Sequence, residues 1–193
     1  MEPIKSTAEI LAFKALNRNI NKVWIDWAVD MLVAGFDTEN LRILAGESEP
    51  INQFYAQDLA EKVLSELNLD YSDKEKTIKK YASYLLDKYI SNNTDNFKIL
   101  EILKNLCVEL DYTTYLYDFY LLYWAKEELL EIGEQYYWKR NDLNTKNIDD
   151  FITTYFKNYL NGVETVADVK QSEIAKIPFW KKNLKMLCKN KSK

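Results

Sequence analysis

Residues Leu110 to Leu130 read LDYTTYLYDFYLLYWAKEELL, and this stretch decides the fold. From Tyr112 to Ala125, seven of the fourteen residues are aromatic and Asp118 carries the only charge. A helix that is apolar on nearly every side belongs in the interior of a helical bundle. The run is too short to cross a bilayer, which takes about 20 apolar residues. It therefore predicts a buried helix over about residues 113–130 and no transmembrane segment.

A second apolar helix is predicted over residues 23–33, where only Lys22, Asp26 and Asp30 form a polar strip. The chain has 193 residues, 47% of them hydrophobic, which suits one globular domain. Its four Gly and three Pro are too few for the turns of a strand-rich fold. We therefore predict an all-α protein, a single domain over residues 1–193 with seven to nine helices around the two buried ones.

Capping residues and apolar spacing predict the other helices. Ser6 with Glu9 and Ser72 with Glu75 have the spacing of capping boxes, in which a Ser side chain bonds to the first turn of a helix. Pro50 suits the first turn of a further helix. The helices are expected over about residues 6–17, 38–45, 50–67, 72–90, 94–110 and 148–161.

The charges of the chain are unevenly distributed. Residues 176–193 contain seven Lys and no acid, so the remaining chain has 19 basic and 30 acidic residues, a net charge of −11. After a linker at 163–172, we predict a basic amphipathic helix over 178–189. It could lie on a membrane, bind a partner or nucleic acid, or dock on the body. We expect docking, because one short helix is a marginal membrane anchor. Its polar side carries Lys181, Lys182, Lys185 and Lys189.

Several classes of function lack their usual residues. Histidine is absent, which removes the commonest general base and metal ligand. Cys107 and Cys188 form no CxxC pair, and the N-terminus has no apolar signal region, so we expect a reduced, cytoplasmic location. No Gly-rich phosphate loop is present, and we expect no cofactor.

Asp118 is the first candidate for a functional site, since a carboxylate among apolar residues must be paired, hydrogen-bonded or solvated. Asp111 lies seven residues earlier, on the same side by helical spacing, and with nearby tyrosines the two could line an acidic cleft. Alternatively, Asp118 accepts a hydrogen bond from a Tyr hydroxyl or faces water. The aromatic residues around it form either a packed core or a binding surface. Helical spacing divides them into two stripes, one of Tyr112, Phe119 and Tyr123 and the other of Tyr117, Tyr120 and Trp124.

Four glutamates, Glu127, Glu128, Glu131 and Glu134, gather at the end of the same predicted helix. Such a run usually marks a solvent-exposed helix end. Alternatively, carboxylates three or four residues apart could hold Mg²⁺ in a small metal-dependent hydrolase. All-helical nucleotide pyrophosphohydrolases use ExxE followed by ExxD, but the later segment here begins with Asn147, so the pattern is incomplete.

Three segments, WAVDMLVAGFDTENLRILAGESEPINQF (Trp27–Phe54), DFYLLYWAKEEL (Asp118–Leu129) and YYW (Tyr136–Trp138), resemble segments of small all-helical bacterial proteins of unassigned activity. Some of those proteins belong to toxin–immunity gene neighbourhoods. The resemblance implies an all-helical fold and a binding or immunity role, and it transfers no site residues.

Together these patterns predict a non-enzymatic protein of immunity or adaptor type that binds a basic protein partner. The acidic body disfavours nucleic acid, which is itself a polyanion. The oligomeric state stays open. The residues expected to contact the partner are Asp111, Tyr112, Tyr115, Asp118, Glu128, Glu131 and Trp138.

Overall fold

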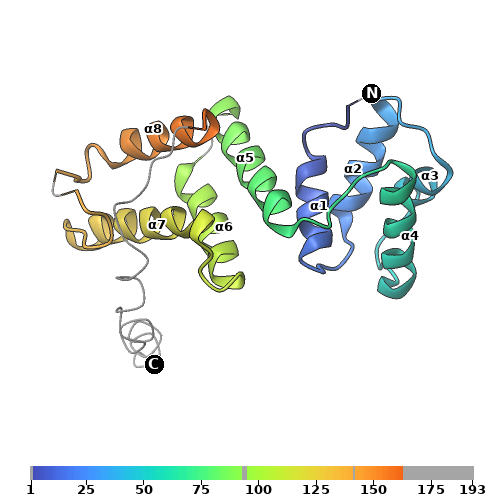
Figure 1. Cartoon of the computed structure of the whole chain (residues 1–193), viewed down its shortest axis with the longest axis horizontal. Coiled ribbons are helices and arrows are strands. Elements are labelled where there is room, and N and C mark those ends of the chain that lie inside the picture. The colour runs from blue at the N-terminus through green and yellow to red at the C-terminus, as the bar shows by residue number, and fades with distance from the viewer. Residues whose placement is uncertain (1, 93–94, 141, 163–193) are drawn as a thin grey trace. The chain divides into compact units, whose positions relative to one another are not determined.

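The computed structural model describes residues 2–92, 95–140 and 142–162. These residues contain eight α-helices and no strand (Figure 1). The predicted all-α class is confirmed, and the number of helices lies within the predicted seven to nine. The predicted linker at 163–172 and the basic helix at 178–189 lie outside the described residues.

The helices belong to two compact units, one extending to Asp95 and one beginning at Asn96. We call them the N-terminal and C-terminal units and describe each by itself. The boundary follows Asp95, the last residue of the polar run Ser91–Asp95 in the sequence. The prediction of one domain over residues 1–193 stays a prediction.

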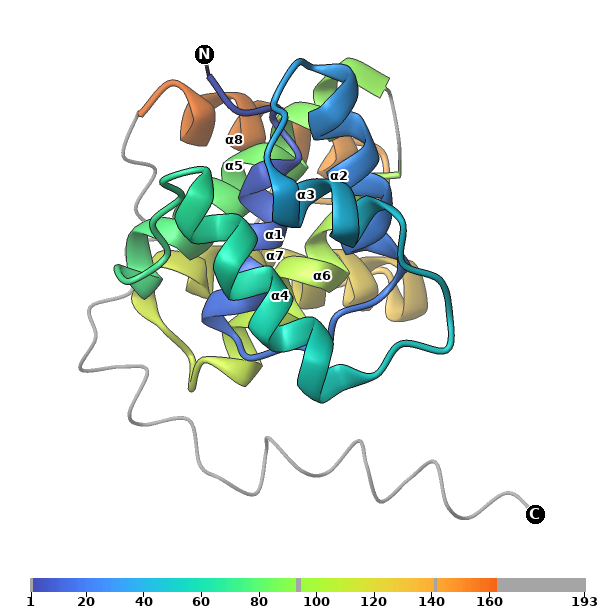
Figure 2. The same cartoon turned by 90° about the vertical axis from the view of Figure 1, so that its right-hand side faces the viewer.

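The N-terminal unit contains five helices. In it α1 packs against α2 and α5, and α3 packs against both α2 and α4. Figure 2 shows this unit from the side of α3 and α4. The helices are α1 (Thr7–Ala15), α2 (Lys22–Val33), α3 (Glu39–Ala45), α4 (Gln53–Glu66) and α5 (Lys74–Asn92).

The core of this unit is built on the tryptophans of α2. Trp27 is 2% exposed, and its indole N–H donates a 3.0 Å hydrogen bond to the Thr7 hydroxyl on α1. Trp24 is fully buried and packs edge-on against Trp27. The opposite side of α2 is open, since Val33 is 84% exposed. The sequence pattern suggested that α2 is buried around most of its circumference. In the structure the helix is buried along one face only.

The helix caps differ from the predicted capping boxes. The Ser6 side chain makes no cap hydrogen bond; Glu9 instead accepts a 3.3 Å bond from the Tyr81 hydroxyl on α5. At the start of α5 it is Asp73, rather than Ser72, whose carboxylate accepts a backbone N–H, that of Lys76. Neither predicted capping box forms. In α1 a tertiary contact takes up the Glu9 side chain, and at α5 the neighbouring Asp73 accepts the backbone N–H in place of Ser72.

The C-terminal unit contains α6 (Asn96–Glu109), α7 (Thr114–Ile132) and α8 (Ile148–Leu160). Nine residues of α7 are buried, and at about 100° per residue they surround the helix, as predicted. The ring of Phe119 on α7 contacts Tyr155, Phe156 and Tyr159 of α8 at centroid distances of 5.8, 6.1 and 5.1 Å. None of the described helices is long and apolar enough to span a membrane.

Candidate functional site

Asp118 is held between α7 and α8. Its carboxylate accepts a 2.7 Å hydrogen bond from the hydroxyl of Tyr155, and it is partly buried. The ring of Tyr155 also packs edge-on against Trp138, at 5.7 Å. Two of the predicted partner-binding residues, Asp118 and Trp138, are therefore joined through one tyrosine that the sequence analysis did not single out.

The predicted cleft placed Asp111 and Asp118 on one side by helical spacing, although the predicted helices leave a break at about residues 111–112. In the structure α6 ends at Glu109 and α7 begins at Thr114. Asp111 and Tyr112 lie in the intervening turn with φ angles of 54° and 59°, in the left-handed region. The helical spacing therefore does not apply to them, and Asp111 is exposed whereas Asp118 is partly buried.

The same turn changes the predicted aromatic stripes. Tyr112 packs edge-on against Tyr120 at 5.4 Å rather than joining Phe119. Tyr120 in turn contacts Trp124, which stacks on Tyr137 at 6.0 Å. Trp124 is partly exposed, although it lies on the helix predicted to be buried, and Tyr115 is also partly exposed. Most of the ring pairs are internal contacts, so these aromatic residues act mainly as a packed core.

The C-terminal end of α7 is different, because it presents large side chains to solvent. Ile132 is 63% exposed and Tyr136 is 76% exposed. Gly133 ends the helix in the left-handed region with φ 78°, and the chain then turns back. The N–H of Tyr136 donates a 3.1 Å hydrogen bond to Glu128, and its hydroxyl donates a 2.6 Å bond to Glu134.

Helical geometry shows which residues share this surface. Glu128, Glu131 and Ile132 are spaced three and four residues apart and lie on one side of the helix. The bond from Tyr136 to Glu128 keeps the following loop beside that side. Leu130 is 58% exposed but points about 200° away from Ile132, so it lies elsewhere. We call Glu128, Glu131, Ile132, Glu134 and Tyr136 the α7-end surface.

The charges of this surface oppose the field of the helix. A helix C-terminus carries partial negative charge, and acidic residues there cost about 0.3–1 kcal/mol each. Glu128 and Glu131 occupy the last turns of α7, and the last turn itself contains no basic residue. The hydrogen bond to Glu134 raises the pKa of Tyr136, so its hydroxyl stays protonated and keeps donating. In the described residues, no three Cys, Asp or Glu side chains are placed to hold a metal ion.

A buried lysine fixes the helix just before these glutamates. Lys126 is 7% exposed, and its ammonium group donates hydrogen bonds to Asn96 at the start of α6 and to Asp149, at 2.7 Å, on α8. It also lies 5.1 Å from the ring centroid of Phe97. This contact joins all three helices of the unit and gives the end of α7 a rigid base. Sequence reasoning missed it because a lysine in a KEE run looks like part of a solvated charge cluster.

The predicted site residues thus fall into three groups. Glu128 and Glu131 belong to the α7-end surface, Asp118 and Trp138 surround Tyr155, and Asp111, Tyr112 and Tyr115 lie in or beside the turn before α7. Ile132 and Tyr136 were missed as site residues, although apolar residues within an acidic run could have indicated them. The basic residues Lys181, Lys182, Lys185 and Lys189 lie outside the described residues.

Comparisons with protein-family models, with curated proteins and with solved structures give no match to this chain.

Proposed function

We propose that this chain is a non-enzymatic binding protein of immunity or adaptor type, and that the α7-end surface engages a basic protein partner. The observation that carries the proposal is the exposure of Ile132 and Tyr136 among Glu128, Glu131 and Glu134. Exposed apolar side chains surrounded by charges of one sign are typical of interaction sites. The immunity or adaptor role extends the resemblance of Asp118–Leu129 and Tyr136–Trp138 to small bacterial helical proteins.

The energetics of α7 support a binding role. Glutamates in the last turn of a helix interact unfavourably with its dipole, and residues that break a local rule are expected at functional positions. A basic partner would bring positive charge to the end of α7, whose last turn contains no basic residue. Long-range attraction to residues 1–175, with their net charge of −11, would also raise the association rate at low salt.

A loss of binding with the fold retained tests the proposal. Glu131→Lys places a positive charge in the last turn of α7, where it suits the helix dipole, so the variant should stay folded. The immobilised variant should capture less of the basic protein that the wild type retains from the source cells at low salt. If capture is unchanged, the α7-end surface does not bind the partner.

Glu109→Lys is the matched control. Glu109 is the last residue of α6, so its replacement makes the same charge reversal at a helix C-terminus. It precedes the start of α7, whereas the surface lies at the end of that helix, about 27 Å away for 19 residues. The control should therefore stay folded and should capture the partner as the wild type does.

A further inference from the structure

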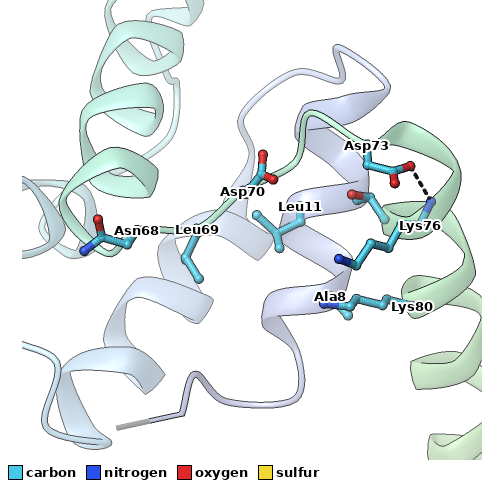
Figure 3. Close-up of a pocket in the computed structure, with 9 residues that line it drawn as sticks. Ala8, Leu11, Asn68, Leu69, Asp70, Asp73, Lys76 and Lys80 are labelled. Atoms are coloured by element: carbon cyan, nitrogen blue, oxygen red, sulfur yellow. Dashed lines mark hydrogen bonds between the residues drawn. The ribbon is translucent and has the colours of Figure 1, made fainter.

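The N-terminal unit contains a polar pocket that takes no part in the proposed function. Its volume is about 220 Å³, and its walls come from α1, from the connection between α4 and α5, and from the first turns of α5 (Figure 3). Pockets for drug-sized ligands usually reach about 300–1,000 Å³. This pocket therefore suits a small molecule rather than a nucleotide.

Charges of both signs line the pocket. Lys76 and Lys80 lie one turn apart on α5, and Figure 3 shows both side chains extending towards Ala8 and Leu11 of α1. Asp70 and Asp73 lie at the connection that leads into α5. Formal charges of two lysines and two aspartates cancel, so a ligand with several negative charges would be repelled by the carboxylates.

The two lysines are available for a ligand. The neighbouring Lys79 pairs with Glu75 at 2.6 Å, whereas Lys76 and Lys80 form no ion pair with the residues that the structure describes. Hydrogen bonds from Ser72, and to a lesser extent the nearby Lys76, lower the pKa of Asp70, so this carboxylate keeps its charge. Separate positive and negative positions thus remain in one small pocket.

Thr77 provides an independent observation. It is 5% exposed and lines the pocket. Its backbone N–H bonds to the carbonyl of Asp73, but its hydroxyl has no hydrogen-bond partner among residues 2–92. The hydroxyl is not among the fully buried polar atoms that lack a partner in the described residues, so it is open to the pocket, where a polar molecule can complete its bonding.

We propose that this pocket binds a small zwitterion of the free α-amino acid class. The carboxylate of the ligand lies between Lys76 and Lys80 and accepts a hydrogen bond from the Thr77 hydroxyl. The ammonium group faces Asp70 and Asp73. Leu11 and Leu69 supply apolar contact for a short side chain.

The first test is a thermal-shift and calorimetric screen of the full chain against the twenty common amino acids. For any amino acid that binds, two matched probes follow, the amine that lacks the carboxylate and the acid that lacks the amino group. The proposal expects at least one amino acid to bind and both probes to bind at least tenfold more weakly. It is overturned if no amino acid binds or if either probe binds as well as the parent.

Variants of the residues that line the pocket then test whether it is a specific binding site for the amino acid. Lys80→Gln should weaken binding at least tenfold, whereas Lys79→Gln, one residue away and outside the pocket, should not. Thr77→Val keeps the shape of the side chain and removes the unpartnered hydroxyl, so its melting temperature should not fall while its affinity does. If Thr77→Val binds as well as the wild type, the hydroxyl does not face the ligand and the proposal fails.

Discussion

The hydroxyl of Tyr155 donates a 2.7 Å hydrogen bond to the carboxylate of Asp118, and this bond joins the two helices on which the C-terminal unit is built. The carboxylate lies among aromatic rings, and the hydroxyl of a tyrosine that itself packs against Phe119 satisfies it. Asp118 is therefore explained as part of the core that fixes α8 on α7.

This bond predicts a graded mutational response. Asp118→Asn keeps an acceptor for Tyr155, so it should cost less free energy of unfolding than Asp118→Leu, which leaves the hydroxyl without an acceptor. Tyr155→Phe should cost about 1.5–3 kcal/mol, the range for a hydrogen bond to a charged group. Urea denaturation measures all three. Equal losses for Asp118→Asn and Asp118→Leu would show that the hydrogen bond contributes nothing.

The sequence predicted the kind of partner that Asp118 has but not which residue it is. A carboxylate among tyrosines needs a donor, and this local argument holds in the structure. Tyr155 lies 37 residues away, and only the packing of α8 on α7 brings it near. In the same way, the period of α7 and the break before it were predictable, but the left-handed conformation of Asp111 and Tyr112 in that break was not, because neither residue is a glycine.

Buried lysines mark a second limit of prediction. Lys14 is 7% exposed and is bonded to Gln57 and Glu61, both at 3.0 Å, and Lys126 is buried to the same extent. Composition rules place lysine at the surface unless it is paired, and the pairing depends on distant residues. The acidic end of α7 was visible in the sequence, whereas the exposure of Ile132 and Tyr136 required the structure.

Asp149 predicts how the C-terminal unit responds to acid. Partial burial acts to raise the pKa of Asp149, but hydrogen bonds from Lys126 and Asn96 outweigh it and lower the pKa below the usual 3.8. Folding therefore favours the charged carboxylate of Asp149. The stability that this carboxylate contributes is fully present above the usual pKa, and it is lost as the pH falls through the lowered pKa of the folded state. Compared with Asp149→Asn, the wild type should be more stable at pH 6. The difference should shrink below about pH 4, as denaturation at a series of pH values would show, and a constant difference would contradict the pairing.

Cys107 should be unreactive in the folded protein. Its side chain is fully buried, and burial raises the pKa of the thiol to about 12. Thiol reagents attack the thiolate, so a native Cys188→Ser variant should not react at pH 8 and should show one reactive thiol in guanidinium chloride. Rapid reaction of the native variant would mean that α6 does not pack on α7 as described.

Divalent cations should leave the stability of the protein unchanged. If the carboxylates at 127–134 held Mg²⁺ or Mn²⁺, as a metal-dependent hydrolase requires, a hundredfold excess over the Kd would add about 2.7 kcal/mol. We expect the same melting temperature with either cation as with Na⁺ at equal ionic strength. A shift that Glu131→Gln abolishes would support the hydrolase over the binding protein.

Site-specific photocrosslinking in the source cells tests the central claim most directly. A photoreactive residue placed at Ile132 or at Tyr136 reports on the α7-end surface, and one at Leu130 is the control. Leu130 is similarly exposed but points about 200° away from Ile132. The proposal predicts a discrete adduct with a basic protein at positions 132 and 136, little at 130, and loss of the adduct when Glu131→Lys is added. No adduct at 132 and 136, or an equal adduct at 130, would contradict it.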